Sequence, residues 1–505
     1  MKDILVVGGG SAGVMSAYTF KKLFPEKNVI ILESEDIPTV GVGESTLGRI
    51  NAWIKMVGLN EKDFIKKCNA SLKMSIRFEN FYKKGDGGFH YPFGAPFFNH
   101  PNDWFVKKAL YPETPLSDYA ESYYPIMALV NSNKVSTEKF EGYSYDSDVA
   151  YHFDATMFAN WLKSEFVKIG GAVEKGNVEK FNVNEDGIES IITDKQKKYT
   201  ADLFIDCTGW KSVLLGGVLK EPFNSYSNIL PNNKAWAAHL PYTNKQEQLK
   251  PYTNCTALTN GWVWNIPLWS RIGTGYVYSD KYISDEEALK EFKTYLNRDD
   301  LNFRNLKMRV GLHERIFVKN VCAIGLSAGF IEPLESNGLL SVHVFLCNLV
   351  KIIKDRPIIS NFLKDQFNTA CHKFFKIFSE FVASHYALSI RNDSEYWKDI
   401  QKRDYPMDKT YLKYDSHFQM NNHYNFDRHL YPKYETGMSC IGVGMNFCPT
   451  DENILKHDDY GNDLEVLKNK WSDVIQQMEE RKQNWKDKIK DCPTLYEHLK
   501  QLHDL

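Results

Sequence analysis

Apolar and polar positions alternate in a recognisable order from the N-terminus to Glu33. Residues 4–7 form a short β-rich apolar run, residues 14–22 have the pattern of a helix, and residues 28–32 form a second apolar run that ends at Glu33. A glycine-rich turn, G-G-G-S-A-G, joins the first run to the helix. This order predicts a βαβ unit with G-x-G-x-x-G at its first turn, which is typical of dinucleotide binding.

The three glycines of the G-x-G-x-x-G motif each have a physical reason. Gly8 permits the tight turn, Gly10 lets the backbone approach a pyrophosphate, and Gly13 lets the helix pack close to the strand. Glu33 ends the second strand, at the separation from Gly13 where an acid binds ribose hydroxyls. The acid favours FAD or NAD over NADP, and the alternative is a purely structural glycine-rich turn.

A second cluster of small residues, G-V-G-E-S-T at 41–46, follows the second strand. It indicates another close approach of the chain to a ligand, with an ordinary loop as the alternative.

Strands able to return to the first sheet recur late in the chain. Residues 201–207 and 321–325 are β-rich runs that end at glycine. The sequence therefore predicts a mixed α/β fold with a discontinuous cofactor domain. The predicted divisions are a cofactor domain from 1–90, 150–225 and 310–348, an inserted substrate region from 91–149 and 226–309, and a mainly helical region from 349–505.

Composition narrows the class of protein. The hydrophobic share of 43% in 505 residues excludes a disordered chain. Lys and Arg total 62 against 64 Asp and Glu, so no basic excess indicates a nucleic-acid partner. The nine scattered cysteines include no C-x-x-C, which favours a reduced, cytoplasmic protein without a metal site. We expect neither a signal peptide nor a membrane span, because no uncharged apolar run reaches roughly 18 residues.

Two further motifs carry a family resemblance. G-W-V-W-N-I-P at 261–267 contains W-x-W-x-I-P, and F-I-E-P-L-E-S-N-G occupies 330–338. With the two glycine clusters and Lys73, they resemble the flavin-dependent halogenases of the tryptophan halogenase type. The similarity also includes Y-H-F-D at 151–154, D-C-T-G at 206–209 and F-V-A-S-H-Y at 381–386, and it extends to about residue 400.

The resemblance implies the Rossmann-like fold of flavoprotein monooxygenases related to p-hydroxybenzoate hydroxylase. It implies FAD, reduced by a separate flavin reductase, which with O2 oxidises a halide to hypohalous acid. Lys73 falls at the active-site lysine, which passes the halogen to a small aromatic substrate, and Glu335 falls at the catalytic acid. Without the family, Lys73 would be assigned to a solvated strand surface and Glu335 to a helix N-terminus.

The remaining site residues follow the same resemblance. The residues expected to contact the cofactor are Gly8, Gly10, Ser11, Ala12, Gly13, Glu33, Ser34, Val40, Gly41, Val42, Gly43, Ser45, Val178, Leu326 and Leu339. The residues expected at the halide are Asn337 and Gly338. Those expected at the substrate, or in the barrier that separates it from the flavin, are Trp262, Trp264, Ile266, Pro267, His90, Tyr91, Phe93 and Ser336; the tryptophans could instead be ordinary core.

Three departures from the family bear on specificity. Asn337 replaces the family's Thr, Tyr91 stands where tryptophan-specific members have His, and T-G-M-S at 436–439 lacks their aromatic pair. We therefore predict an electron-rich indole, phenol or aniline as the substrate rather than free tryptophan. We also predict bromide or iodide over chloride; the alternative is that Asn337 adds a donor and leaves chloride use intact.

Two other functions stay open from the sequence. A flavin-dependent aromatic hydroxylase would need its substrate beside the flavin, which W-x-W-x-I-P disfavours. A flavin-binding sensor or an inactivated relative would not need both Lys73 and Glu335. A homo-oligomer is an open alternative to a monomer.

Overall fold

The computed structural model is described residue by residue except in several segments. The described residues are 1–36, 43–97, 103–354, 356, 358–405, 435–446 and 464–503, with backbone only for 435–439.

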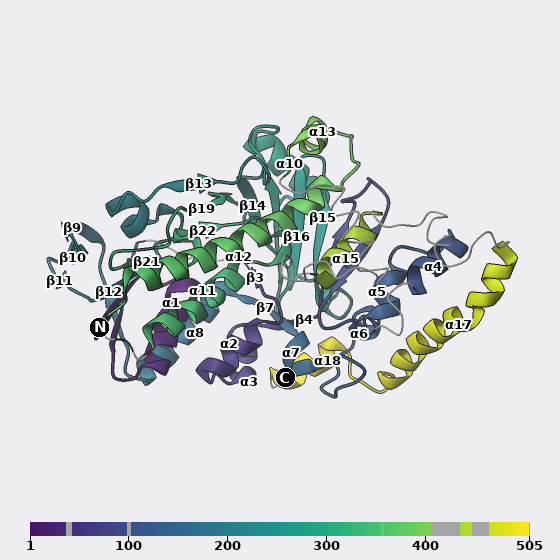
Figure 1. Cartoon of the computed structure of the whole chain (residues 1–505), viewed down its shortest axis with the longest axis horizontal. Coiled ribbons are helices and arrows are strands. Elements are labelled where there is room, and N and C mark those ends of the chain that lie inside the picture. Colours follow the sequence, from purple (N-terminus) through teal and green to yellow (C-terminus); the bar gives the residue numbers. More distant parts are fainter. Residues whose placement is uncertain are drawn as a thin grey trace.

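A six-stranded sheet in the order β20-β21-β12-β1-β2-β8 forms the first layer. Its strands are parallel except β20, which is antiparallel to β21. Helix α1 packs between α8 and α11 (Figure 1). The strands are β1 Asp3–Val7, β2 Asn28–Glu33, β8 Ala172–Lys175, β12 Leu203–Asp206, β20 Phe317–Val318 and β21 Val321–Ala323, and the helices are α1 Ser11–Leu23, α8 Ala155–Lys168 and α11 Gly338–Ile353. The predicted βαβ unit and the mixed α/β fold are confirmed.

A second sheet of seven strands has the order β18-β14-β17-β16-β15-β5-β6. Adjacent strands of this sheet are antiparallel, except that β5 runs parallel to β15. Its strands are β5 Ser75–Glu79, β6 Gly88–Pro92, β14 Lys234–Leu240, β15 Tyr252–Ala257, β16 Gly261–Pro267, β17 Ile272–Tyr278 and β18 Arg304–Lys307. The domain boundary predicted at residue 90 falls within β6. Strand β5, on the N-terminal side of that boundary, pairs with a strand far along the chain, as its register Tyr252↔Ser75 shows.

A three-stranded sheet links the two layers. It has the order β3-β7-β4, with β3 Gly43–Ser45, β7 Ala150–Asp154 and β4 Ser71–Lys73. Apolar and polar residues alternate from 72 to 78 as in a single strand, but the structure divides this run between β4 and β5. The break falls at Met74, whose N–H donates to the Pro251 carbonyl outside either sheet. This break places Lys73 at the junction between the layers.

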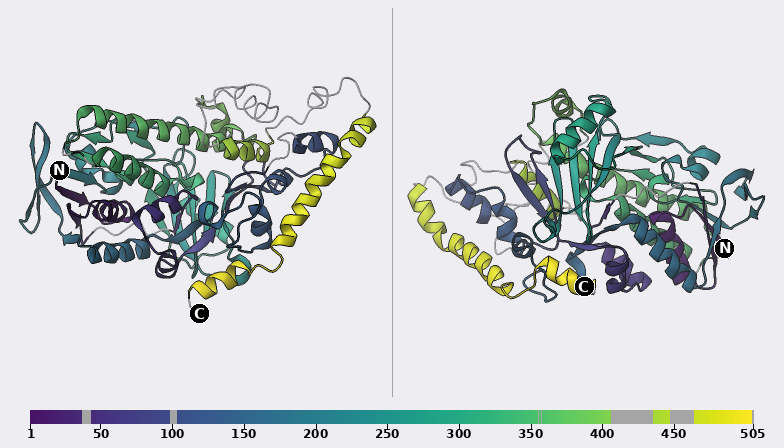
Figure 2. Two further views of the ribbon diagram at one scale, coloured as in Figure 1. Left: turned by 60° about the horizontal axis from the view of Figure 1, so that its bottom comes forward. Right: turned by 180° about the vertical axis from the view of Figure 1, so that it is seen from behind.

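Helices cover the sheets and extend the molecule away from the N-terminus. The long helix α12, Asn361–Ala387, runs beside α11 across the body (Figure 1). Helix α17, Leu464–Lys488, lies at the far end from the N-terminus (Figure 2). On α17, Trp485 is buried and Trp471 is partly buried against a small apolar cluster.

The remaining elements are short or peripheral. The helices are α2 Ile50–Val57, α3 Glu61–Lys67, α4 Asp103–Leu110, α5 Asp118–Tyr123, α6 Ile126–Ser132, α7 Tyr145–Asp148, α9 Lys245–Gln248, α10 Asp285–Leu296, α13 Glu395–Lys402, α15 Glu435–Gly444 and α18 Leu495–Leu502, with short helical turns η1 Gly209–Lys211, η2 Val213–Val218, η3 Gly325–Ser327 and η4 Pro333–Glu335. The strands are β9 Val178–Asn184, β10 Gly187–Thr193, β11 Lys198–Tyr199, β13 Phe223–Ser225, β19 Gly311–His313 and β22 Gly329–Phe330.

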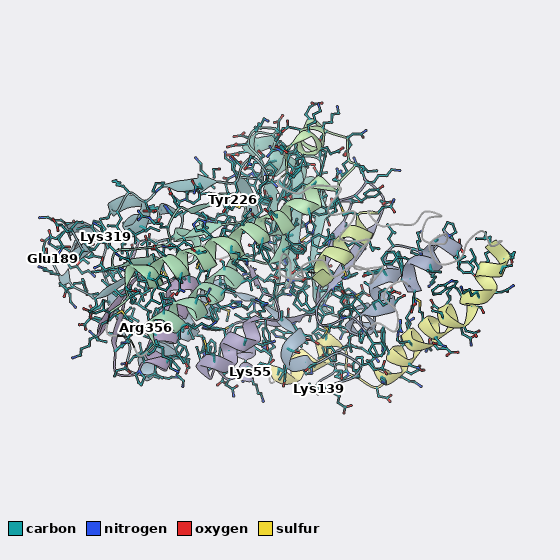
Figure 3. The ribbon with its side chains drawn as sticks, in the orientation of Figure 1. Lys55, Lys139, Glu189, Tyr226, Lys319 and Arg356 are labelled. Carbon is teal, nitrogen blue, oxygen red and sulfur yellow. The ribbon has the colours of Figure 1, made fainter. Side chains whose placement is uncertain are left out.

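Charged side chains such as Lys55, Lys139 and Glu189 are exposed and project from the periphery (Figure 3). Among the described helices, none is long and apolar enough to cross a membrane. Nor do the described His, Cys, Asp and Glu side chains form a group of three or more that could hold a metal ion.

Candidate active site

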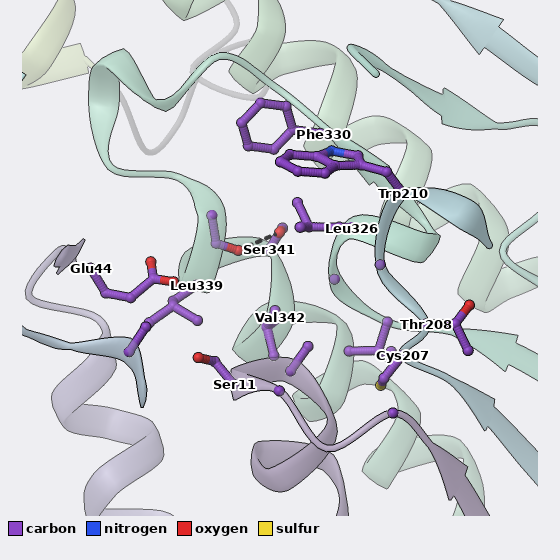
Figure 4. Close-up of a pocket in the computed structure, with 18 of the residues that line it drawn as sticks. Ser11, Glu44, Cys207, Thr208, Trp210, Leu326, Phe330, Leu339, Ser341 and Val342 are labelled. Atoms are coloured by element: carbon purple, nitrogen blue, oxygen red, sulfur yellow. Dashed lines mark hydrogen bonds between the residues drawn. The ribbon is translucent and has the colours of Figure 1, made fainter. Parts of the chain in front are cut away.

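A cavity of about 560 Å³ opens above the β1–α1 turn. Gly8 has φ +112°, a conformation that L side chains rarely adopt. A Cβ on Gly13 would lie 1.8 Å from the Gly8 carbonyl oxygen, whereas a Cβ on Gly10 would meet nothing within 4 Å. Gly8, Gly10, Ser11 and Ala12 line the cavity at the start of α1, as Figure 4 shows for Ser11. Backbone N–H groups at such a helix start suit a phosphate.

Glu33 closes one end of the cavity from the tip of β2. Its carboxylate lies 2.9 Å from the Lys163 ammonium and 2.5 Å from that of Lys175. Burial raises the pKa of the Glu33 carboxyl, but hydrogen bonds from Lys175 and Lys163 outweigh burial and lower that pKa below its ordinary value. The carboxylate is therefore ionised and able to accept hydrogen bonds from hydroxyl groups.

Most other predicted cofactor residues lie on the same cavity. They are Ser34, Gly43, Ser45, Val178, Leu326 and Leu339. Val40, Gly41 and Val42 lie outside the described residues.

The sequence reasoning missed several cavity residues. Trp210 and Phe330 pack edge to face with ring centroids 5.9 Å apart at the upper wall (Figure 4). Trp210 directly follows D-C-T-G, and that motif was the available signal. Glu44 also lines the cavity (Figure 4). Desolvation, followed by the charge of Asp154, raises the pKa of the Glu44 carboxyl to about 7.

Lys73 is fully buried at the end of β4. Its Nζ donates to the Thr46 carbonyl oxygen at 3.0 Å and to Ser336 Oγ at 2.7 Å, and it lies 5.0 Å from the centroid of the Phe93 ring. Burial lowers the pKa of the Lys73 amine to about 7, and the nearby Glu335 carboxyl opposes this shift. A lysine in this state can lose its proton near neutral pH.

Glu335, at the end of η4, is equally buried. Its Oε1 lies 3.0 Å from Nε2 of His385 on α12. Burial raises the pKa of the Glu335 carboxyl, whereas His385 and Lys73 act to lower it. The sequence offered His385 only as part of F-V-A-S-H-Y, without a role.

The loop between Glu335 and α11 borders both the cavity and Lys73. Ser336, Asn337 and Gly338 line the cavity, while Ser336 Oγ accepts the Lys73 hydrogen bond. The side-chain amide of Asn337 has a partner within the protein, because Nδ2 donates to the Glu332 carbonyl oxygen at 2.9 Å. The start of α11 thus leaves backbone donors at the cavity.

The two tryptophans of β16 have different environments. Trp264 and Ile266 line the cavity, whereas Trp262 is fully buried and donates from Nε1 to the Tyr386 hydroxyl at 2.9 Å. Their ring centroids are 6.2 Å apart. Pro267 lies at the strand end, where its carbonyl accepts a hydrogen bond from Ser71. One tryptophan therefore forms the wall and the other anchors it.

Residues of β6 and its C-terminal end divide between two faces. The Tyr91 ring lies 5.9 Å from Phe93 and 6.0 Å from Phe381 of α12. His90 does not join them: its Nδ1 lies 3.0 Å from Ser75 Oγ and its ring packs edge-on against Tyr252. Burial, then the charge of Arg77, lowers the pKa of His90 to about 3.

Comparison with known proteins gives one consistent answer. The sequence profile described as tryptophan halogenase matches residues 3–457. Tryptophan 7-halogenase KtzQ from Kutzneria sp. (strain 744) is 36% identical over 430 residues, covering 79% of this chain and 78% of that protein. The chain belongs to the tryptophan halogenase family.

Two solved structures agree with this assignment. The halogenase superposes on VirX1 in its apo form with a TM-score of 0.87, 34% identity and 99% of each chain covered. It superposes on Tar14, a tryptophan C-6 flavin-dependent halogenase from taromycin biosynthesis, with a TM-score of 0.85, 30% identity and 100% of each chain covered. The protein is therefore a flavin-dependent halogenase that acts on an aromatic substrate and uses reduced FAD.

The cavity of this halogenase fits the cofactor. The Gly8 to Gly13 turn leaves open backbone where the pyrophosphate would lie, and the ionised Glu33 suits ribose hydroxyls. Trp264 and Ile266 offer a flat apolar wall for the ring system. When bound, reduced FAD with O2 supplies the oxidising equivalents for the halide.

Proposed function

We propose that this halogenase forms hypohalous acid at the FAD cavity and that Lys73 receives the halogen and passes it to an electron-rich aromatic ring. The observation that carries the proposal is the buried hydrogen bond from Lys73 to Ser336, a residue that also lines the cavity. The Ser336 side chain thus lies between Lys73 and the cavity. A neutral lysine amine in this position can attack the halogen of hypohalous acid.

Glu335 completes the proposed site as a proton acceptor. The pKa of Lys73 responds to the Glu335 charge, so the two groups are close enough to interact. A ring that gains a halogen must lose a proton, and a buried carboxyl with a raised pKa suits that transfer. The wall of Trp264 would keep the organic substrate from the flavin, which separates halogenation from hydroxylation.

For the cofactor, we propose contacts along the whole cavity wall. The turn at Gly8, Gly10, Ser11 and Ala12 would hold the pyrophosphate, as the open space at Gly10 supports, and Gly13 would allow the close packing that shapes this turn. Glu33 would bind the ribose, and the segment of Gly43 and Ser45 would cover the flavin.

The proposed substrate is an indole, phenol or aniline rather than free tryptophan. Tyr91, Phe93 and Phe381 support an aromatic ring, because Tyr91 packs against both phenylalanines and the Phe93 ring lies 5.0 Å from Lys73 Nζ. The absence of an aromatic pair at 436–439 supports a substrate without the amino-acid group, although the side chains there lie outside the described residues. A site without polar partners for an amino acid does not select one.

The proposed halide is bromide or iodide. Asn337 uses an amide N–H on the Glu332 carbonyl, which supports a site that depends on backbone donors at the start of α11. Chloride is more strongly hydrated than the larger halides, so it requires more donors to replace its lost water.

The decisive experiment compares the parent with Lys73→Ala in a mixture of FAD, a flavin reductase, NADH, O2, bromide and an indole. We expect the variant to lose halogenation by roughly 10²-fold or more. FAD binding and hydrogen peroxide release should persist, because Lys73 acts after the oxidation. Lys55→Ala, at an exposed lysine, is the matched control. Halogenation at the parental rate in Lys73→Ala would show that Lys73 does not transfer the halogen. A hydroxylated product from the parent would contradict the proposed halogenation.

A further inference from the structure

Buried hydroxyl groups connect Lys73 to His152 on the neighbouring strand β7. Lys73 Nζ donates to Ser336 Oγ at 2.7 Å, and Ser336 donates in turn to Ser45 Oγ at 3.0 Å. Ser45 Oγ lies 2.8 Å from Thr253 Oγ1, which lies 2.9 Å from Nε2 of His152. All of these side chains are buried. The hydroxyls of Ser336, Ser45 and Thr253 therefore form one continuous series of hydrogen bonds, the hydroxyl network.

The far end of the hydroxyl network fixes the tautomer of His152. The Ser71 hydroxyl donates to the Pro267 carbonyl oxygen, which only accepts, so the single hydrogen of Ser71 is committed. Nδ1 of His152 lies 3.4 Å from Ser71 Oγ and must therefore supply the hydrogen of that contact. Burial, then the charge of Lys73, lowers the pKa of His152 well below its ordinary value, so the ring is neutral. Nε2 of this neutral ring is thus a hydrogen-bond acceptor.

A single direction follows along the hydroxyl network, because each hydroxyl has only one hydrogen to donate. Thr253 donates to Nε2 of His152 and therefore accepts from Ser45. Ser45 in turn accepts from Ser336. The Ser336 hydrogen thus points away from Lys73, and the Ser336 oxygen accepts from the amine. The direction deduced from His152 agrees with the donors at the Lys73 end.

This direction decides whether the lone pair of a neutral Lys73 amine is free. A neutral amine has two N–H groups and one lone pair. Its two N–H groups reach the Thr46 carbonyl oxygen at 3.0 Å and Ser336 Oγ at 2.7 Å. Within the described part of the chain these are the hydrogen bonds of Lys73, so its lone pair has no donor. If the hydroxyl network were reversed, the Ser336 hydrogen would occupy that lone pair.

We propose that Ser45 and Thr253 are positioning residues of Lys73: they hold the Ser336 hydrogen away from the amine and so leave its lone pair free for the halogen. The inference rests on the proposed role of Lys73. In the step that it supports, the Lys73 amine attacks the halogen of hypohalous acid. The N–halogen bond forms, the O–halogen bond breaks, and the departing hydroxide takes one amine proton and leaves as water.

The test is Thr253→Val, which keeps the shape of the side chain and removes its hydroxyl. Among the described residues, Ser45 then has only Ser336 as an acceptor, so the hydrogens of both serines turn toward Lys73. We expect halogenation to fall roughly tenfold, because the lone pair must leave a hydrogen bond before it attacks. Thr253→Ser returns the hydroxyl and should restore halogenation. Peroxide release without aromatic substrate should match the parent in both variants.

Ser45→Ala interrupts the hydroxyl network one step nearer Lys73 and repeats the test should Thr253→Val fail to fold. Because both substitutions turn the same Ser336 hydrogen, the double variant should lose no more halogenation than Ser45→Ala alone. Rates are compared at saturating FAD, since Ser45 and Thr253 line the cavity.

Thr256→Val is the matched control. Thr256 is buried on the same strand β15, but its hydroxyl donates to Glu79 and lies outside the hydroxyl network. This variant should halogenate at the parental rate.

Parental halogenation in a folded Thr253→Val or Ser45→Ala would overturn the inference. So would equal losses in Thr253→Val and Thr253→Ser, the same loss in Thr256→Val, or losses that multiply in the double variant. Failure of the proposed function has a different signature, because Lys73→Ala would then retain halogenation.

Discussion

At the scale of single residues, the buried amine of Lys73 makes stability depend on pH. Burial lowers its pKa from 10.5 to about 7, so between these values the unfolded chain binds a proton that the folded chain does not. Stability therefore falls as pH decreases across this window, by about 1.4 kcal/mol per pH unit. We expect the free energy of unfolding of the parent, relative to Lys73→Met, to fall by roughly 2 kcal/mol from pH 9 to pH 7.

Denaturant titrations of both proteins at the two pH values measure this difference. Lys55→Met should show no comparable change, because Lys55 is exposed. An identical pH dependence in the parent and Lys73→Met would mean that the amine is hydrated in solution.

Asn337 gives the halide prediction its test. A competition among equimolar chloride, bromide and iodide on one indole should yield mainly brominated or iodinated product. Asn337→Thr should raise the chlorinated share. The substitution removes the amide that donates to the Glu332 carbonyl oxygen, and it restores the residue and the hydroxyl of the family. Predominantly chlorinated product from the parent would contradict the preference.

The sequence indicated candidate site residues, but it did not indicate their surroundings. The resemblance indicated Lys73 and Glu335, but nothing near them in the chain predicts their burial. Their partners, Ser336 for Lys73 and His385 for Glu335, lie far away in sequence, so the environment forms only when the layers pack. His90 and Tyr91 are neighbours in sequence, and only the register of β6 on β5 determines which of them packs with Phe93 and Phe381.

At the scale of elements, the β1–α1 turn separates a folding role from a binding role. A Cβ on Gly13 would lie 1.8 Å from a backbone oxygen, whereas one on Gly10 would point into open space. Gly13→Ala should lower the stability of the FAD-free protein by at least about 2 kcal/mol. Gly10→Ala should change it by less than about 1 kcal/mol yet weaken FAD binding more than about tenfold.

Thermal unfolding without FAD and a fluorescence titration with FAD distinguish the two variants. Equal loss of stability in both, or undiminished FAD affinity in Gly10→Ala, would contradict the assignment.

This turn was predictable because strand, turn and helix are local in sequence. The break between β4 and β5 was not, because Met74 is held by Pro251, far along the chain.

At the scale of the whole molecule, one nucleotide site implies dependence on a second protein. G-x-G-x-x-G occurs once in the sequence, and its turn belongs to the cavity assigned to FAD. A hydride donor must place its nicotinamide against the flavin ring. In the described part of the chain, the proposed ring end of the cavity is bordered by Trp264, Ile266 and the start of α11.

The purified protein with FAD should therefore be reduced by NADH no faster than free FAD under anaerobic conditions, as flavin absorbance would record. A catalytic amount of flavin reductase should restore rapid reduction and, once air is admitted, halogenation. Rapid reduction by NADH without the reductase would reveal a nicotinamide site in this chain and would make it a self-sufficient enzyme.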